Sequence, residues 1–181
     1  MLYHGSAIGD LTELKPCLSE HGKPYVYFAE NPVVALLYAV KPVQKPHSFY
    51  PFGFDKNGTV VYSEYFPDAF SVLYKGKTGY LYEAVNVENL ETPTHIPGVY
   101  TTKEPVRVKG VTEILDLYTH FTEWIKEGLF RIKTHSEISD KEMAFVVSAL
   151  KADMEKYSLK KNASHAMSRF IEAYFPAVWN A

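Results

Sequence analysis

The sequence predicts an α+β fold, in which a strand-rich body over residues 1–114 is followed by a helical segment over residues 115–181. Through the first part, short runs rich in Val, Tyr, Phe and Thr alternate with Gly-, Pro- or Asn-containing turns, as the strands of a sheet do. From about Leu115 onward, apolar residues recur every three or four positions, as on one face of a helix. We expect this helical segment to pack on the same domain as the strands.

The strands of the body are predicted in chain order from β-forming runs. The first is Leu2–His4, which ends at Gly5, and a stronger one lies in "KPYVYFAE". Asn31 follows it and is suited to cap a buried helix in "PVVALLYAV". The Pro-rich stretch "KPVQKPHSFYPFGFDKNG" predicts a long loop ending in an Asn57-Gly58 hairpin turn. Further strands are predicted in "TVVYSEYF", "GYLYEAVNV" and the Pro-interrupted "VYTTKEPVRVKGVTEI", with one or two helical turns in "PDAFSVLY".

Three helical stretches are predicted in the C-terminal segment: "ILDLYTHFTEWIKEGLF", "SDKEMAFVVSALKADMEKYSL" and "ASHAMSRFIEAYFPAVW". Ser139 or Asp140 is expected to cap the second helix, because Glu142 follows at the spacing of a capping box. Ser164 is expected to cap the last helix.

Composition excludes several functional classes. The chain has 181 residues, 46% hydrophobic and 22% charged, with a net charge of −2, which argues against a nucleic-acid-binding surface. A single cysteine, Cys17, cannot build a disulfide framework or a cysteine zinc site within one chain, so a cytoplasmic location is expected. The chain lacks the pattern of a signal peptide and any apolar run of about 18 residues, so no membrane segment is expected.

Candidate functional residues lie in the first two strands. His4 is followed by Gly5, which permits close approach of a ligand to the backbone, and by Ser6, which supplies a hydroxyl. Tyr27 lies in the strand that leads into the capped helix. If the two strands are neighbours, His4 and Tyr27 border one crevice. A lone histidine at a strand end is otherwise most often a structural residue.

The motif "LYHGS", followed by "YVYFAENPVVALLYA", resembles the ADP-ribosyltransferase fold in its branch with a His-Tyr-acid triad. That branch includes poly(ADP-ribose) polymerases, RNA 2′-phosphotransferases and rifamycin ADP-ribosyltransferases. The later region "GYLYEAVNV … VYTTKEPVRVKG" is similar to the rifamycin-modifying group. The resemblance covers about residues 1–112 and implies a split β-sheet body.

The resemblance implies NAD-dependent transfer of ADP-ribose to an unidentified acceptor, with nicotinamide released and no metal required. It implies that His4 binds the nicotinamide ribose, that the Gly5 backbone holds the nicotinamide amide, and that Ser6 contacts the adjoining ribose. Tyr27 would stack on the nicotinamide ring, and Tyr38 would also contact NAD. This set suits the chemistry, because cleaving the glycosidic bond requires a held aromatic leaving group and stabilised positive charge on the ribose.

The acid of the triad has three candidates, Glu83, Glu91 and Glu104. Polymerases of the family carry an acid immediately ahead of the strand that corresponds to "VYTT", where this chain has Gly98-Val99. We favour Glu104, because a polar stretch at a Pro-interrupted strand edge can turn a carboxylate into a crevice. Two alternatives to transfer remain open: a module that binds NAD or an ADP-ribose-like ligand, and an interaction protein with a vestigial crevice. The acceptor and the oligomeric state are open.

Overall fold

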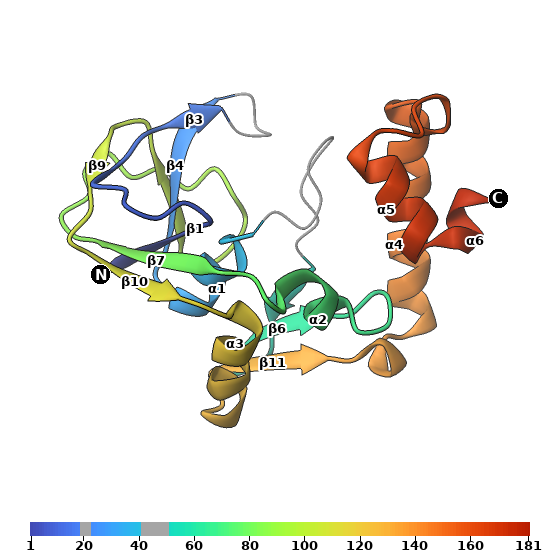
Figure 1. The fold of residues 1–181 in the computed structure, drawn as a ribbon, viewed down its shortest axis with the longest axis horizontal. Helices are drawn as coiled ribbons and strands as arrows, with labels where there is room; N and C mark the ends of the chain where they lie inside the picture. The colour runs from blue at the N-terminus through green and yellow to red at the C-terminus, as the bar shows by residue number, and fades with distance from the viewer. Residues whose placement is uncertain (19–22, 41–50) are drawn as a thin grey trace. The chain divides into compact units, whose positions relative to one another are not determined.

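The computed structural model describes residues 1–18, 23–40 and 51–181 (Figure 1). It confirms an α+β fold with a helical C-terminal segment. The chain forms two compact units, Met1–Val40 with Tyr74–Leu129, and Lys41–Leu73 with Phe130–Ala181. The two units are not separated at residue 114, because each of them contains residues from both sides of that position. The predicted boundary at 114 stays a prediction.

The first unit is built on an antiparallel sheet in the order β10-β7-β1-β4-β3, with β8 paired to the other edge of β4. A short pair, β2 with β9, lies beside it. The strands are β1 (Leu2–Ser6), β2 (Glu13–Leu14), β3 (Cys17–Leu18), β4 (Pro24–Ala29), β7 (Gly79–Ala84), β8 (Val99–Thr102), β9 (Val106–Arg107) and β10 (Gly110–Ile114).

The sheet is interrupted between β1 and β4. β1 pairs with β7 over five residue pairs and β4 pairs with β8 over four. Among the described residues, the ladder between β1 and β4 holds one pair, Tyr3 with Ala29. Further back on the same strand, Tyr25 of β4 pairs with Cys17 of β3. Tyr27 therefore lies between the two pairings, and β4 runs at a steep angle to β1 and β7 in Figure 1.

The two faces of this sheet are covered differently. On one face, Val26, Phe28 and Tyr82 belong to a buried cluster that also contains Leu14 and Ala84. On the other face, the helix α1 (Pro32–Leu37) packs against β1 and is buried along most of its length. The predicted cap is confirmed, since the Asn31 side chain accepts a hydrogen bond from the Val33 amide at 2.9 Å.

The second unit contains a three-stranded sheet of β5 (Phe52–Phe54), β6 (Val60–Ser63) and β11 (Phe130–Lys133). The predicted hairpin turn at Asn57-Gly58 is confirmed between β5 and β6, with Gly58 at a φ of +82°. One prediction was wrong in part. Residues Phe52–Phe54 of the predicted loop form the strand β5, and residues 41–50 of that loop lie outside the described residues. The first helical stretch predicted in the C-terminal segment is confirmed over Leu117–Lys126, and its last residue, Phe130, begins the strand β11.

The helices are α2 (Ala69–Tyr74), α3 (Leu117–Lys126), α4 (Asp140–Lys156), α5 (Ala166–Tyr174) and α6 (Pro176–Trp179), with 3₁₀ turns at His135–Glu137 and Leu159–Lys161. The capping box of α4 is confirmed with Ser139 as its cap. The prediction that Ser164 caps the last helix was wrong. His165 caps α5 through its ring Nδ1, which accepts from the Met167 amide, while Ser164 donates to Asn162. Within the described ranges, no helix combines the length and apolar character needed to cross a bilayer.

The capping box of α4 predicts an acid-sensitive contribution to stability. Glu142 accepts two hydrogen bonds from Lys133 Nζ, at 2.6 and 2.8 Å, and further ones from Ser139. The Lys133 ammonium first, and then Ser139, lower the pKa of Glu142 from 4.5 to about 2. Because the folded pKa is depressed, this contribution is present above pH 4.5 and is lost as the pH falls toward 2.

We therefore expect Glu142→Gln to lower the denaturation midpoint at neutral pH, since Gln keeps the capping geometry and loses the charge. The exposed Glu155 on the same helix gives the matched control, Glu155→Gln. Chemical denaturation measured at pH 7 and near pH 2 checks this expectation, because the deficit of Glu142→Gln should disappear at the lower pH. A deficit of equal size at both pH values would contradict it.

Candidate functional site

His4 is held in one orientation by the backbone of β4. Its ring Nδ1 lies 2.8 Å from the carbonyl oxygen of Tyr27. A carbonyl can only accept, so Nδ1 carries the proton and donates it. Burial lowers the pKa of His4 below its ordinary value of 6.5, and the bond to Tyr27 opposes this shift. The imidazole is therefore neutral at pH 7, with Nε2 as a hydrogen-bond acceptor.

The direction of the Tyr27 carbonyl follows from the ladder between β4 and β8. The Glu30 amide donates to the Gly98 carbonyl at 2.9 Å, so these two residues form a hydrogen-bonded pair. Such pairs alternate along an antiparallel ladder, and Tyr27 with Thr101 is three pairs further on. Tyr27 therefore directs its N–H and C=O away from β8, toward the edge that faces β1. His4 meets the carbonyl there.

The backbone N–H and C=O of Gly5 also face the interruption between β1 and β4. Ala29 is two residues from Tyr27 and directs its polar groups to the same edge, where it faces Tyr3. Gly5 is two residues from Tyr3, so its N–H and C=O point toward β4. The carbon of a side chain at Gly5 would lie 2.0 Å from the Ala35 carbonyl oxygen. The glycine is therefore required by the close contact with α1, and its φ is not in the left-handed region.

The side chains of His4 and Tyr27 leave the sheet on opposite faces. His4 is paired with Tyr82, and its ring centroid lies 6.5 Å from that of Tyr82 and 6.2 Å from that of Phe28. Successive residues of a strand point to opposite faces, so Tyr27 lies on the face away from Phe28. There its ring meets Tyr25 edge to face, with centroids 6.1 Å apart. The interruption in the sheet is therefore bordered by His4 from one face and by Tyr27 from the other.

The structure brings Glu91 close to the tyrosines of β4. Glu91 bridges to Thr101 of β8 outside the regular strands. The Tyr25 hydroxyl donates to Glu91 Oε2 at 3.1 Å, and Lys103 forms an ion pair with the same carboxylate. The hydrogen bond from Lys103, followed by that from Tyr25, lowers the pKa of Glu91, so it is a carboxylate at neutral pH. Glu91 thus joins the Tyr25–Tyr27 pair on its face of the sheet.

The other two acids lie elsewhere in the first unit. Glu104 is exposed in the turn after β8, where its amide donates to the Thr102 hydroxyl at 3.2 Å. Glu83 lies in β7, opposite Tyr3 and Gly110, so β1 separates it from β4. No hydrogen bond joins either carboxylate to His4 among the described residues. The choice of Glu104 as the triad acid stays a prediction.

Ser6 keeps a hydroxyl donor for a ligand, and Tyr38 is partly exposed. The Ser6 hydroxyl oxygen accepts from the Ile8 amide at 3.0 Å, which leaves its O–H as a donor. Tyr38 follows α1 as its C-terminal cap and exposes 37% of its surface. Both belong to the unit that contains His4. Their predicted roles in binding NAD stay predictions.

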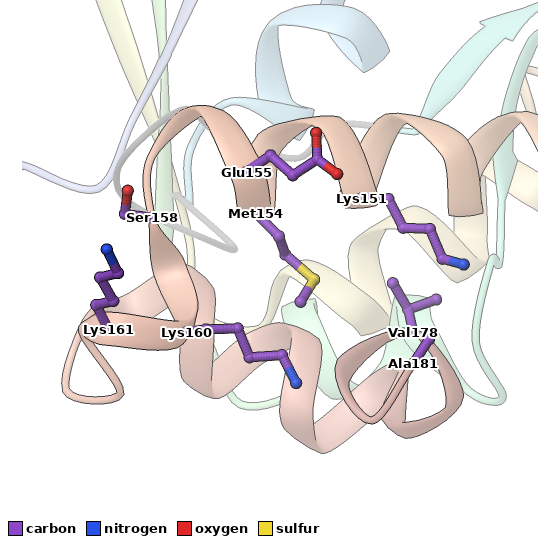
Figure 2. A pocket seen from close by; sticks show the side chains of 8 residues that line it. All are labelled: Lys151, Met154, Glu155, Ser158, Lys160, Lys161, Val178 and Ala181. Atoms are coloured by element: carbon purple, nitrogen blue, oxygen red, sulfur yellow. The ribbon is translucent and has the colours of Figure 1, made fainter.

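A separate surface hollow of about 480 Å³ lies in the second unit (Figure 2). Figure 2 shows side chains of α4 on one side of it and the C-terminal turn on the other. It has an apolar floor and a rim with three lysines, and its lining residues are Lys151, Met154, Glu155, Ser158, Lys160, Lys161, Val178 and Ala181. It contains none of the residues predicted for NAD.

Comparisons with known proteins assign no family to this chain. No family model matches it, and no curated protein matches it. In the part of the chain that the structure describes, no group of three or more His, Cys, Asp or Glu residues is arranged to hold a metal ion. The interpretation of the site therefore depends on its own geometry and on the resemblance of its motifs.

Proposed function

We propose that the protein transfers ADP-ribose from NAD to an acceptor and releases nicotinamide. The observation that carries the proposal is the interrupted ladder between β1 and β4. It is bordered by the His4 ring, which is bonded to the Tyr27 carbonyl, and by the backbone polar groups of Gly5. Backbone N–H and C=O groups that face such an interruption are suited to hold a ligand that carries both donors and acceptors.

The polar groups at the interruption match the nicotinamide riboside portion of NAD. A primary amide has two N–H donors and one carbonyl acceptor, which the C=O and N–H of Gly5 complement. The neutral His4 ring offers Nε2 as an acceptor for a ribose hydroxyl. Tyr27 and Tyr38 supply aromatic surfaces for the flat nicotinamide ring.

In the proposed reaction, the bond between the ribose carbon and the nicotinamide nitrogen of NAD is cleaved. The electron pair of that bond leaves with nicotinamide, an acceptor atom bonds the ribose carbon, and the proton of the acceptor passes to solvent. Among the three acids predicted for the site, Glu91 has the contacts that favour a role. Its charge is fixed beside Tyr25 by Lys103, where it stabilises positive charge that develops nearby. Glu104 is the alternative acid.

A second candidate function is binding of NAD or an ADP-ribose-like ligand without transfer. The undecided acid of the triad motivates it, since binding does not require the carboxylate. The third candidate, an interaction protein with a vestigial crevice, is favoured by the opposite placement of the His4 and Tyr27 side chains, with the His4 ring against Phe28 and Tyr82. We propose a cytoplasmic location, which the single cysteine supports, and expect neither a nucleic-acid partner nor a membrane partner.

Labelled NAD tests the proposed function directly. The wild-type protein is expected to bind NAD in calorimetry and to release free nicotinamide when candidate acceptors are supplied. Binding without release would support the second candidate. If neither binding nor release is measured with any acceptor, both are excluded and the interaction protein remains.

Tyr27 offers a matched pair of variants for the binding step. Tyr27→Ala removes the aromatic surface and is expected to weaken NAD binding roughly tenfold, the scale of one aromatic contact. Tyr27→Phe keeps the ring and should bind NAD within about twofold of wild type. Calorimetry measures both affinities, with circular dichroism to confirm that each variant is folded. Equal affinities for the two variants would show that the ring does not contact NAD.

A further inference from the structure

The surface hollow of the second unit forms where the chain reverses after α4. Ser158 has a φ of +51° and adopts the left-handed conformation, which turns the chain back at the end of the helix. The 3₁₀ turn Leu159–Lys161 follows at once, and Leu159 buries its side chain. The hollow, of about 480 Å³, is lined by α4, by this turn and by residues 178 and 181.

The floor of the hollow is apolar. Met154 of α4 and Val178 of α6 both line it, although only 9% and 5% of their surfaces are exposed. Side chains that are so buried border the hollow only at its bottom, so the apolar surface is recessed. The volume lies within the range of sites that bind small molecules, about 300–1,000 Å³. The floor therefore suits the apolar part of a small ligand, because binding removes this surface from water.

Two of the three rim lysines extend toward the same side of the hollow. Figure 2 shows the ammonium groups of Lys151, from α4, and Lys160, from the 3₁₀ turn, both directed toward the C-terminal turn, with Met154 between them in this view. The Glu155 carboxylate points away from the floor. Lys160 is held in place, since its ammonium donates to the Trp179 carbonyl and lies 4.6 Å from the centroid of the Trp179 ring.

Lys151 has no ion-pair partner in the part of the chain that the structure describes. Glu155 lies four residues further along α4, a spacing at which opposite charges on a helix can meet, and the two side chains form no ion pair. An exposed lysine near the end of a helix is most often a solvated charge that complements the helix dipole. The recessed apolar floor beside Lys151 and the second ammonium of Lys160 distinguish this position from such a lysine.

We propose that the surface hollow binds a small organic anion that carries a short apolar chain, such as a medium-chain carboxylate. The apolar chain lies on Met154 and Val178, and the anionic group lies between the ammonium groups of Lys151 and Lys160. Burial of the chain supplies most of the binding free energy, and the exposed ion pairs select the anion. The hollow belongs to the other unit from His4, so this inference does not depend on the proposed function.

Three probes separate the charge of the ligand from its chain: octanoate, octanol and acetate. Octanoate is expected to bind the wild-type protein saturably in calorimetry. Octanol has the chain without the charge and should bind at least about threefold more weakly. Acetate has the charge without the chain and should show no measurable binding. Equal affinities for octanoate and octanol, or for octanoate and acetate, would overturn the proposal, and so would the absence of octanoate binding.

Trp179 reports whether the probe occupies this hollow. Binding of an anion at Lys160 alters the contact between its ammonium and the Trp179 ring, so octanoate should change the fluorescence of Trp179. Trp124 is the other tryptophan of the chain, and a Trp124→Phe background makes Trp179 the source of the signal. Octanoate binding that leaves this fluorescence unchanged would place the anion elsewhere and overturn the proposal.

Lys151→Met tests the charge at the rim, because Met keeps an unbranched apolar chain and loses the ammonium. Octanoate affinity is expected to fall about threefold to fivefold, with the affinity for octanol unchanged. Lys141→Met is the matched control, since Lys141 is exposed on the first turn of α4 and does not line the hollow. It should bind octanoate as the wild type does. An equal loss in both variants would be an effect of overall charge and would overturn the proposal, as would full affinity in Lys151→Met.

Discussion

Nicotinamide release by the His4→Asn variant is expected to fall at least about 100-fold, with the fold intact. The Asn amide lies at the place of Nδ1 and can donate to the Tyr27 carbonyl, so the position retains its backbone bond. Asn has no atom at the place of the ring nitrogen Nε2, so the acceptor is lost. Loss of one such hydrogen bond to a charge-developing centre typically costs 10²–10³ in rate.

His120 provides the matched control for this variant. It lies on α3 in the same unit, with its ring 4.4 Å from that of Trp124 and no role in the interrupted ladder. His120→Asn is therefore expected to keep turnover within about twofold of wild type. Rates of nicotinamide release, with denaturation curves for each variant, check both expectations. Similar losses in the two variants would remove His4 from the site.

Because His4 is neutral in the folded protein, the free energy of unfolding depends on pH. Burial lowers the folded pKa below the unfolded value of 6.5, so below pH 6.5 the unfolded chain binds a proton that the folded chain does not. Stability is then lost as the pH falls from 6.5 toward the folded pKa, and no loss comes from His4 above 6.5. The free energy of unfolding of His4→Asn should decline less steeply over that window than that of wild type.

Gly5→Ala is expected to destabilise the first unit by roughly 3–5 kcal/mol, the scale of severe overpacking. The added carbon would lie 2.0 Å from the Ala35 carbonyl oxygen and 2.8 Å from its carbonyl carbon. Both are backbone atoms of the buried helix α1, so a rotamer change cannot relieve the contact. Either the helix moves away from β1 or β1 loses its pairing with β7.

Gly110→Ala is the control within the same unit. A side-chain carbon at Gly110 would meet the Glu83 carboxylate at 3.6 Å, which is an ordinary contact. Its stability should stay within about 0.5 kcal/mol of wild type. Denaturant unfolding, followed by circular dichroism, measures both variants. A Gly5→Ala protein as stable as Gly110→Ala would show that α1 does not pack tightly on β1.

Local signals predicted the elements that depend on nearby residues. Asn31 and Ser139 cap their helices as expected, because a cap needs only a side-chain oxygen two or three residues before a free amide. The hairpin turn at Gly58 was also predicted from nearby residues alone, because glycine readily adopts the positive φ of this turn. Ser164 failed as a cap because the next residue, His165, offers a ring nitrogen that reaches the Met167 amide instead.

Pairings between distant residues were beyond the sequence. The strand β11 was not predicted, because its parallel pairing with β6 depends on residues about 70 positions earlier in the chain. Which acid accompanies His4 was also undecided, because the face on which a glutamate lies depends on the register of β4 with β1 and β8. A shift of one residue would reverse every face.

The sequence by itself determined the α+β class, the capped helices and the short His4-Gly5-Ser6 and Tyr27 motifs, since these follow from local propensity and spacing. The tertiary structure determined which residues of these motifs contact one another. It showed that Gly5 is a glycine because α1 packs on it, and that His4 is bonded to the Tyr27 backbone. It also showed that the Glu91 carboxylate lies beside Tyr25 of β4. Contact and register between strands set these relations, and neither can be derived from residues close together in the chain.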